Sequence, residues 1–78
     1  IRSLIGVEIL NVISNEVMVL VKTLTGRASG VASFIDGLES PDIIGTVAGD
    51  DTVLVIPKSI NDIPKIIKFI QDKISETD

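Results

Sequence analysis

The period of the hydrophobic pattern changes along the chain, and this change constrains the fold more than any other feature. Residues 4–13 and 17–24 are rich in β-branched side chains and flank a polar cluster at residues 14–16, which is typical of a β-hairpin. Between residues 27 and 38, apolar side chains recur instead near the helical period of about 3.6 residues. We therefore expect a hairpin followed by a helix.

The second half of the chain repeats this order. Residues 43–48 and 52–56 form two strand patterns around the Gly-Asp-Asp tripeptide at 49–51, and Pro57 ends the second of them. Ser59 suits the N-cap of a second helix. The apolar stripe of that helix consists of Ile60, Ile63, Ile66, Ile67, Ile70 and Ile74. The predicted fold is α+β, a two-layer ββαββα sandwich in which a four-stranded antiparallel sheet carries two helices on one face.

The predicted sheet has apolar side chains on both faces. In the first strand, one face carries Ile5, Val7, Ile9 and Ile13, and the other carries Leu4, Leu10 and Val12. A chain of 78 residues without cysteine or histidine has neither disulfides nor the usual zinc ligands to support its small core. Since large exposed apolar faces mark association sites, we expect one domain over residues 1–78 that forms a homo-oligomer through its sheet.

Charge and hydropathy exclude several classes of protein. The net charge of −4 argues against direct contact with a nucleic-acid backbone. No apolar run reaches the ~20 residues that a membrane span requires, so a soluble, cytoplasmic protein without a membrane partner is expected. The sequence opens on a strand pattern without a methionine, which favours a further N-terminal domain outside this chain.

Adjacent carboxylates at the tip of the second hairpin are the first candidate site. Asp50 and Asp51 follow Gly49, a residue that permits the unusual backbone angles of a tight turn. An ordinary solvated turn is the alternative interpretation. The tip therefore stays open at this point between a binding site and a local structural feature.

A polar stripe on the first helix is the second candidate. Its members share one side of the helix and are Ser29, Ser33 and Asp36. Asp36 lies near the C-terminal end of this helix, where the helix dipole disfavours an anion unless a cation is close. A cationic partner or an ordinary solvated helix face would each account for the stripe.

A longer motif connects these residues. The segment GTVAGDDT, at residues 45–52, resembles the GT[IV]AGDDT signature of the C-terminal domain of bacterial arginine repressors. The upstream stretch from Thr23 through Gly26 and Ala28 to Asp36 and Leu38 is similar to that family's T-x-x-G-x-A segment and the helix that follows it. The resemblance covers essentially the whole chain.

The resemblance implies a function and an assembly. The family's ββαββα domains form trimers that stack face to face as hexamers, with L-arginine bound between the trimers. The resemblance also implies that this chain is the effector-sensing part of an arginine-dependent transcription regulator. DNA would be bound through an N-terminal winged helix-turn-helix domain absent from this chain, and no cofactor, metal or catalytic residue is implied.

Residue roles follow from the same resemblance. Asp50 and Asp51 would meet the ligand's guanidinium group, one of them from the opposing trimer. Asp36 and Ser29 would hold its α-amino and α-carboxylate end, with the backbone near Ala48 close by. Many relatives have Gln or His where this chain has Ser29, whose side chain is too short for the same contact, so a bridging water or another residue would replace it.

Two other functions remain open from the residues alone. Asp36, Asp50 and Asp51 could form a carboxylate cluster that binds Mg²⁺ for phosphoryl transfer, although no phosphate-binding loop accompanies them. Alternatively, the apolar sheet could serve a purely structural trimerisation module without a ligand.

Overall fold

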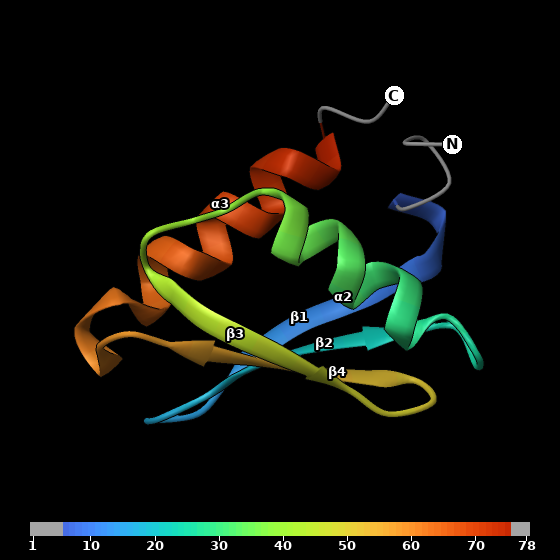
Figure 1. Cartoon of the computed structure of the whole chain (residues 1–78), viewed down its shortest axis with the longest axis horizontal. Coiled ribbons are helices and arrows are strands. Elements are labelled where there is room, and N and C mark those ends of the chain that lie inside the picture. Colours follow the sequence, from blue (N-terminus) through green and yellow to red (C-terminus); the bar gives the residue numbers. More distant parts are fainter. Residues whose placement is uncertain (1–5, 76–78) are drawn as a thin grey trace.

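The computed structural model describes residues 6–75 and contains one antiparallel sheet with both helices on one face (Figure 1). Along the sheet the strand order is β1-β2-β4-β3. The elements are β1 (Ile9–Ser14), β2 (Val19–Thr23), α2 (Ala28–Gly37), β3 (Ile43–Ala48), β4 (Thr52–Pro57), a 3-10 turn (Ile60–Asp62) and α3 (Ile63–Ser75). The predicted two-layer ββαββα arrangement is confirmed.

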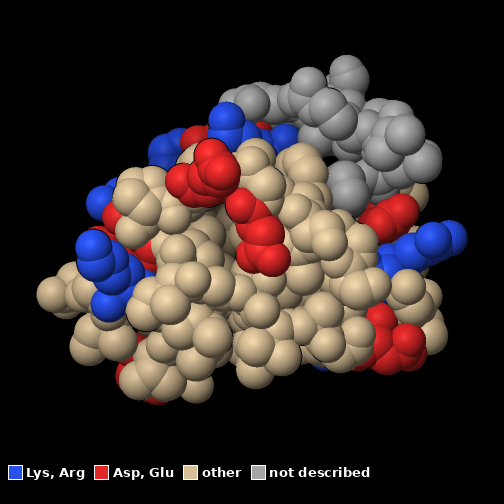
Figure 2. All heavy atoms as spheres, viewed as in Figure 1, with Lys and Arg blue, Asp and Glu red and all other residues tan. Residues whose placement is uncertain are grey.

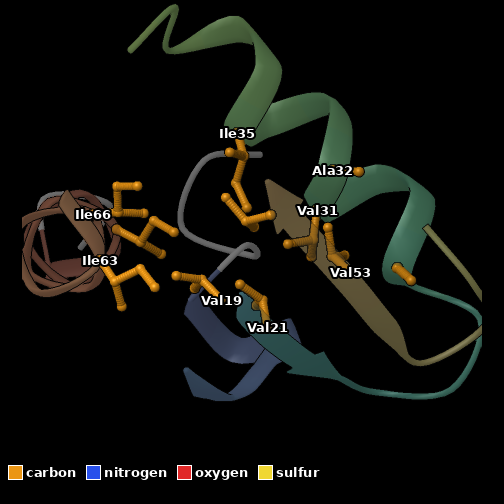
Figure 3. Close-up of a cluster of buried hydrophobic side chains, with 11 residues drawn as sticks. Val19, Val21, Val31, Ala32, Ile35, Val53, Ile63 and Ile66 are labelled. Carbon is orange, nitrogen blue, oxygen red and sulfur yellow. The ribbon is translucent and has the colours of Figure 1, made fainter. Parts of the chain in front are cut away.

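The core lies between the sheet and the two helices. Alternate residues of the central strands point toward the helices and are fully buried, namely Val19, Val21, Val53 and Val55. Helix α2 contacts β3 and β4, and α3 contacts β1 and β2. Figure 3 shows side chains from both helices meeting those of the sheet, among them Val31 and Ile35 from α2 and Ile63 and Ile66 from α3. The core is aliphatic, as the composition predicts.

The first strand is shorter than predicted. It begins at Ile9, because residues 6–8 form a helical turn, while residues 4 and 5 lie outside the described part of the chain. The predicted apolar pattern is thus interrupted by a change in backbone conformation ahead of β1.

The assignment of faces in the first strand is also wrong. The pairing register of β1 with β2 shifts between Ile9 and Asn11. Such a bulge sets two residues against one and changes which side the following residues face. Ile9 and Val12 therefore pack against the core, whereas Leu10 and Ile13 are exposed.

The second helix begins close to the predicted position. Ser59 is its N-cap, and the Ser59 hydroxyl accepts a hydrogen bond of 3.2 Å from the Asn61 N–H. The first turn is a 3-10 turn, and in it Ile60 is 58% exposed, so Ile60 does not belong to the buried stripe. Ile63, Ile66 and Ile70 do. No helix within residues 6–75 is long and apolar enough to cross a membrane.

The sheet face opposite the helices carries a row of aliphatic side chains across all four strands. Ile13 pairs with Leu20, Leu20 with Leu54, and Leu54 with Val47. Directly paired residues of antiparallel strands project on the same side of a sheet. Ile13, Leu54 and Val47 are all exposed. We call this row the open sheet face, and its apolar character agrees with the prediction.

Candidate functional site

The hairpin between β3 and β4 places Asp50 and Asp51 at its tip. The Gly49 N–H donates a hydrogen bond of 2.8 Å to the Thr52 carbonyl and closes the turn. The prediction that Gly49 supplies unusual backbone angles is wrong, because Gly26 is the glycine with positive φ in the described range. A Cβ atom at Gly49 would lie 3.6 Å from the Thr52 carbonyl oxygen, an ordinary contact. Glycine at position 49 is therefore not required by the geometry of this turn.

Backbone hydrogen bonds fasten the tip to the segment that leads into α2. The Asp50 carbonyl accepts from the N–H of Gly26 at 2.9 Å and from the N–H of Ala28 at 3.3 Å. The Asp51 carbonyl accepts from the Thr23 N–H at 2.8 Å. Gly26 has φ of +82°, a conformation that glycine adopts without steric cost. The acidic tip is thus held at the N-terminal end of α2.

The two carboxylates at the tip differ in their surroundings. Asp51 Oδ1 accepts a hydrogen bond of 3.0 Å from the Thr52 hydroxyl, and that hydroxyl accepts one of 2.6 Å from Lys22 Nζ. The Asp50 side chain is exposed and has no hydrogen bond or ion pair with any residue from 6 to 75. One carboxylate is oriented by its neighbours, and the other can turn toward an incoming group.

Asp36 lies at the opposite end of α2. Its Oδ1 atom accepts a hydrogen bond of 2.9 Å from the Thr46 hydroxyl of β3. Among the described residues this hydroxyl, and not a cation, is what contacts the carboxylate. At about 1.5 Å per residue, Asp36 is about 12 Å along the helix axis from Ala28, where the tip is attached. The helix dipole led us to expect a cation beside the Asp36 carboxylate, and the hydrogen bond from the Thr46 hydroxyl supplies part of the stabilisation that such a cation would give.

Ser29 and Ala48 lie near the attached tip. Ser29 follows the first residue of α2, is exposed, and makes no side-chain hydrogen bond within the part of the chain that the structure describes. Ala48 is the last residue of β3 and pairs with Val53, which places its side chain on the helix side of the sheet. The predicted residues therefore follow the line where α2 runs beside β3, with Asp36 separated from the rest.

This separation bears on metal binding. The described residues contain no group of three or more histidine, cysteine, aspartate or glutamate side chains placed to hold a metal ion. Figure 2 shows a group of acidic atoms at the place where Figure 1 draws the β3–β4 turn, and a separate acidic group over the middle of the same face. Most of that face is neither acidic nor basic. The predicted alternative of a three-carboxylate Mg²⁺ cluster lacks its geometry.

Comparison with known proteins identifies the family. Residues 6–72 match the family model described as "Arginine repressor, C-terminal domain". This chain belongs to that family. The arginine repressor of Chloroherpeton thalassium is 62% identical over 76 residues, which are 97% of this chain and 51% of that protein. That of Prosthecochloris aestuarii is 57% identical over 77 residues, 99% of this chain and 52% of the relative. The chain spans about half the length of these relatives.

Membership in the arginine repressor family confirms the resemblance carried by GTVAGDDT, and the family is named for a repressor, not for an enzyme. Three residues around the acids of this arginine repressor domain were not predicted from the sequence. Thr46 contacts Asp36, and Thr52 contacts Asp51. Lys22 contacts the Thr52 hydroxyl. Both threonines stand inside the signature, one on each strand. The feature of the sequence that could have drawn attention to Lys22 is its charge, because it directly follows the apolar residues 19–21 of β2.

Proposed function

We propose that this domain is the arginine-sensing and oligomerising part of a transcription regulator of arginine metabolism, and that L-arginine binds at the acidic tip. The observation that carries the proposal is the pair of exposed carboxylates, Asp50 and Asp51, held by a fixed backbone in a member of the arginine repressor family. Relatives that share 49% to 62% identity with this chain are named arginine repressor.

The chemistry of the tip suits a guanidinium group. A guanidinium presents planar, paired N–H donors that match carboxylates, whereas the neutral ureido group of citrulline carries no charge. Asp51 offers a carboxylate oriented by Thr52, and the Asp50 side chain has room to reorient. Asp36, with Ser29 and the backbone at Ala48, would receive the α-amino and α-carboxylate end along the line between α2 and β3.

Assembly would bring two acidic tips together. We propose that the open sheet face packs in a trimer and that two trimers stack with L-arginine between them. Opposed carboxylates about 4 Å apart, at an effective dielectric constant near 20, repel by about 4 kcal/mol. A cation placed between them reverses the sign of that interaction. Because the ligand then favours the assembled state, its concentration would control the hexamer population.

DNA binding would reside elsewhere in the protein. The relatives are about twice as long as this chain, and a net charge of −4 does not favour contact between this domain and a phosphate backbone. We propose that the other half of the protein is a DNA-binding domain, and that a hexamer presents six copies of it to DNA in the cytoplasm.

Calorimetry and sedimentation test the proposal with the chain itself. L-arginine should give a saturable heat of binding and shift trimers toward hexamers, and citrulline should do neither. An absence of heat with arginine together with a clear heat on addition of Mg²⁺ would overturn it. Unchanged sedimentation and no heat with any ligand would favour a ligand-free trimerisation module, the function that the open sheet face alone would support.

Replacing Asp51 by Asn should abolish the effect of arginine and leave folded trimers, because the open sheet face is unchanged. Asp72→Asn is a matched control, since Asp72 is an exposed acid on α3 that pairs with Lys68 and lies outside the proposed site. Monomeric Asp51→Asn protein would contradict the separation proposed here between ligand binding and trimer formation.

A further inference from the structure

Lys22 occupies an unusual position for a charged residue. It lies on β2, where it pairs with Thr52 of β4 and with Asn11 of β1. Its neighbours Val21 and Thr23 point into the core, so Lys22 projects on the open sheet face, next to the aliphatic row. Its side chain is partly buried, and its ammonium group contacts the Thr52 hydroxyl at 2.6 Å. A lysine at the surface ordinarily keeps this group in water.

The direction of each hydrogen bond in this chain of contacts is fixed by chemistry. An ammonium group has donors and no acceptor, and an ionised carboxylate has acceptors and no donor. The hydroxyl between them has one proton and two lone pairs. Lys22 must therefore donate to the Thr52 oxygen, and Thr52 must donate its proton to Asp51 Oδ1. With one lone pair of the hydroxyl occupied by Lys22, the hydroxyl proton is directed at the carboxylate.

We infer that Lys22 and Thr52 are positioning residues for the ligand-binding carboxylate of Asp51, with Lys22 acting through the Thr52 hydroxyl. This inference rests on the proposed function, since it assigns a purpose to the orientation of Asp51. Oδ1 of Asp51 is engaged by Thr52 within the protomer, which leaves Oδ2 for a guanidinium N–H. Asp50 has no such contact within residues 6–75, so the two acids differ in preorganisation.

Preorganisation of one acceptor has a consequence for selectivity. A carboxylate already held in one orientation does not lose side-chain freedom when the ligand binds. The benefit is largest for a ligand with directed, charged donors and small for a ligand that approaches without them. Loss of Lys22 should therefore lower the affinity for arginine, whose charged donors are directed at this carboxylate.

The experiment is a double-mutant cycle measured by calorimetry with L-arginine as the probe. Thr52→Val and Lys22→Met should each weaken binding, Thr52→Val by about tenfold and Lys22→Met by less, because a hydrogen bond to a charged group is being removed or misdirected. If Lys22 acts through Thr52, then Lys22→Met should have no further effect in the Thr52→Val background. If Lys22→Met instead weakened arginine binding by the same factor in the wild-type and in the Thr52→Val protein, the inference would be overturned.

Conservative variants and a matched control separate positioning from folding. Thr52→Ser keeps the hydroxyl and should retain the wild-type affinity, and Lys22→Arg keeps a donor-only cation and should recover most of it. Lys58→Met removes the same charge at the far end of β4, beyond Pro57, and should leave binding unchanged. Dissociation of Lys22→Met trimers in sedimentation would overturn the inference, because Lys22 would then act in assembly.

The two proposals fail in different ways. If the wild-type chain binds no arginine, the proposed function fails before any variant is compared. If the wild-type chain binds arginine and both Lys22→Met and Thr52→Val bind it with the same affinity, the proposed function stands and the positioning inference fails.

Discussion

Two of the acids predicted from the sequence, Asp36 and Asp51, each accept a hydrogen bond from a threonine hydroxyl. Both threonines belong to the segment GTVAGDDT, so one short segment supplies Asp50 and Asp51 as well as the hydroxyls that orient Asp36 and Asp51. The sequence identified the acids because carboxylates at a turn and at a helix end are distinctive. It could not identify their partners, since the contact between Asp36 and Thr46 depends on how α2 packs beside β3.

The two glycines of the site region differ in what their positions require. Gly26→Ala should lower the free energy of unfolding by about 1–2 kcal/mol, because φ at residue 26 is +82°, a conformation that is costly for L-residues with a side chain. Gly49→Ala should change it by less than about 0.5 kcal/mol, because a Cβ there makes an ordinary contact. Urea unfolding of both variants at one protein concentration measures these changes. Equal losses of unfolding free energy would contradict the conclusion that Gly26 is required for its backbone conformation and Gly49 is not.

At the scale of elements, strands β2 and β4 and helix α3 were predictable from the spacing of their apolar residues. Each of these elements buries one side, and that burial sets the spacing. The start of β1 was not predictable, since residues 6–8 are helical in a stretch whose composition favours a strand. Nor was the register shift between Ile9 and Asn11, which no local sequence signal marks. A second shift lies on the other edge strand, between Ile43 and Gly45. Bulges on both edge strands disfavour pairing of sheets edge to edge.

The isoleucine stripe of α3 gives a test of which positions the fold depends on. Ile66 is 1% exposed within the core between α3 and the sheet, so Ile66→Ala should cost about 2–5 kcal/mol of stability through lost burial and a cavity. Ile60 is 58% exposed, and Ile60→Ala should cost less than about 0.5 kcal/mol. Chemical unfolding at equal protomer concentration compares them. A similar loss for both would mean that Ile60 is buried in the assembly.

At the scale of the whole molecule, the helices cover one face of the sheet (Figure 1). The aliphatic row on the other face is left exposed. The register shifts on both edge strands direct association to this face and away from the edges. The acidic tip, in contrast, is held at the end of the sheet where α2 begins. The molecule therefore presents two distinct surfaces, an apolar one suited to permanent contact and a charged one whose association, under the proposed function, would need a cation.

Leu54→Asp tests whether the open sheet face holds the protomers together. Leu54 lies at the centre of the aliphatic row, paired with Leu20 and Val47, and is 38% exposed, so a single protomer can accommodate a carboxylate there. Buried against a second copy, the same carboxylate would lack a partner and be strongly unfavourable. Leu54→Asp should therefore sediment as a folded monomer with the far-ultraviolet circular dichroism of the wild type. Ile60→Asp adds the same charge at an exposed isoleucine in the turn before α3 and should leave the oligomer intact. A Leu54→Asp oligomer of wild-type size would show that another surface joins the protomers, because an unpaired carboxylate could not remain within the contact.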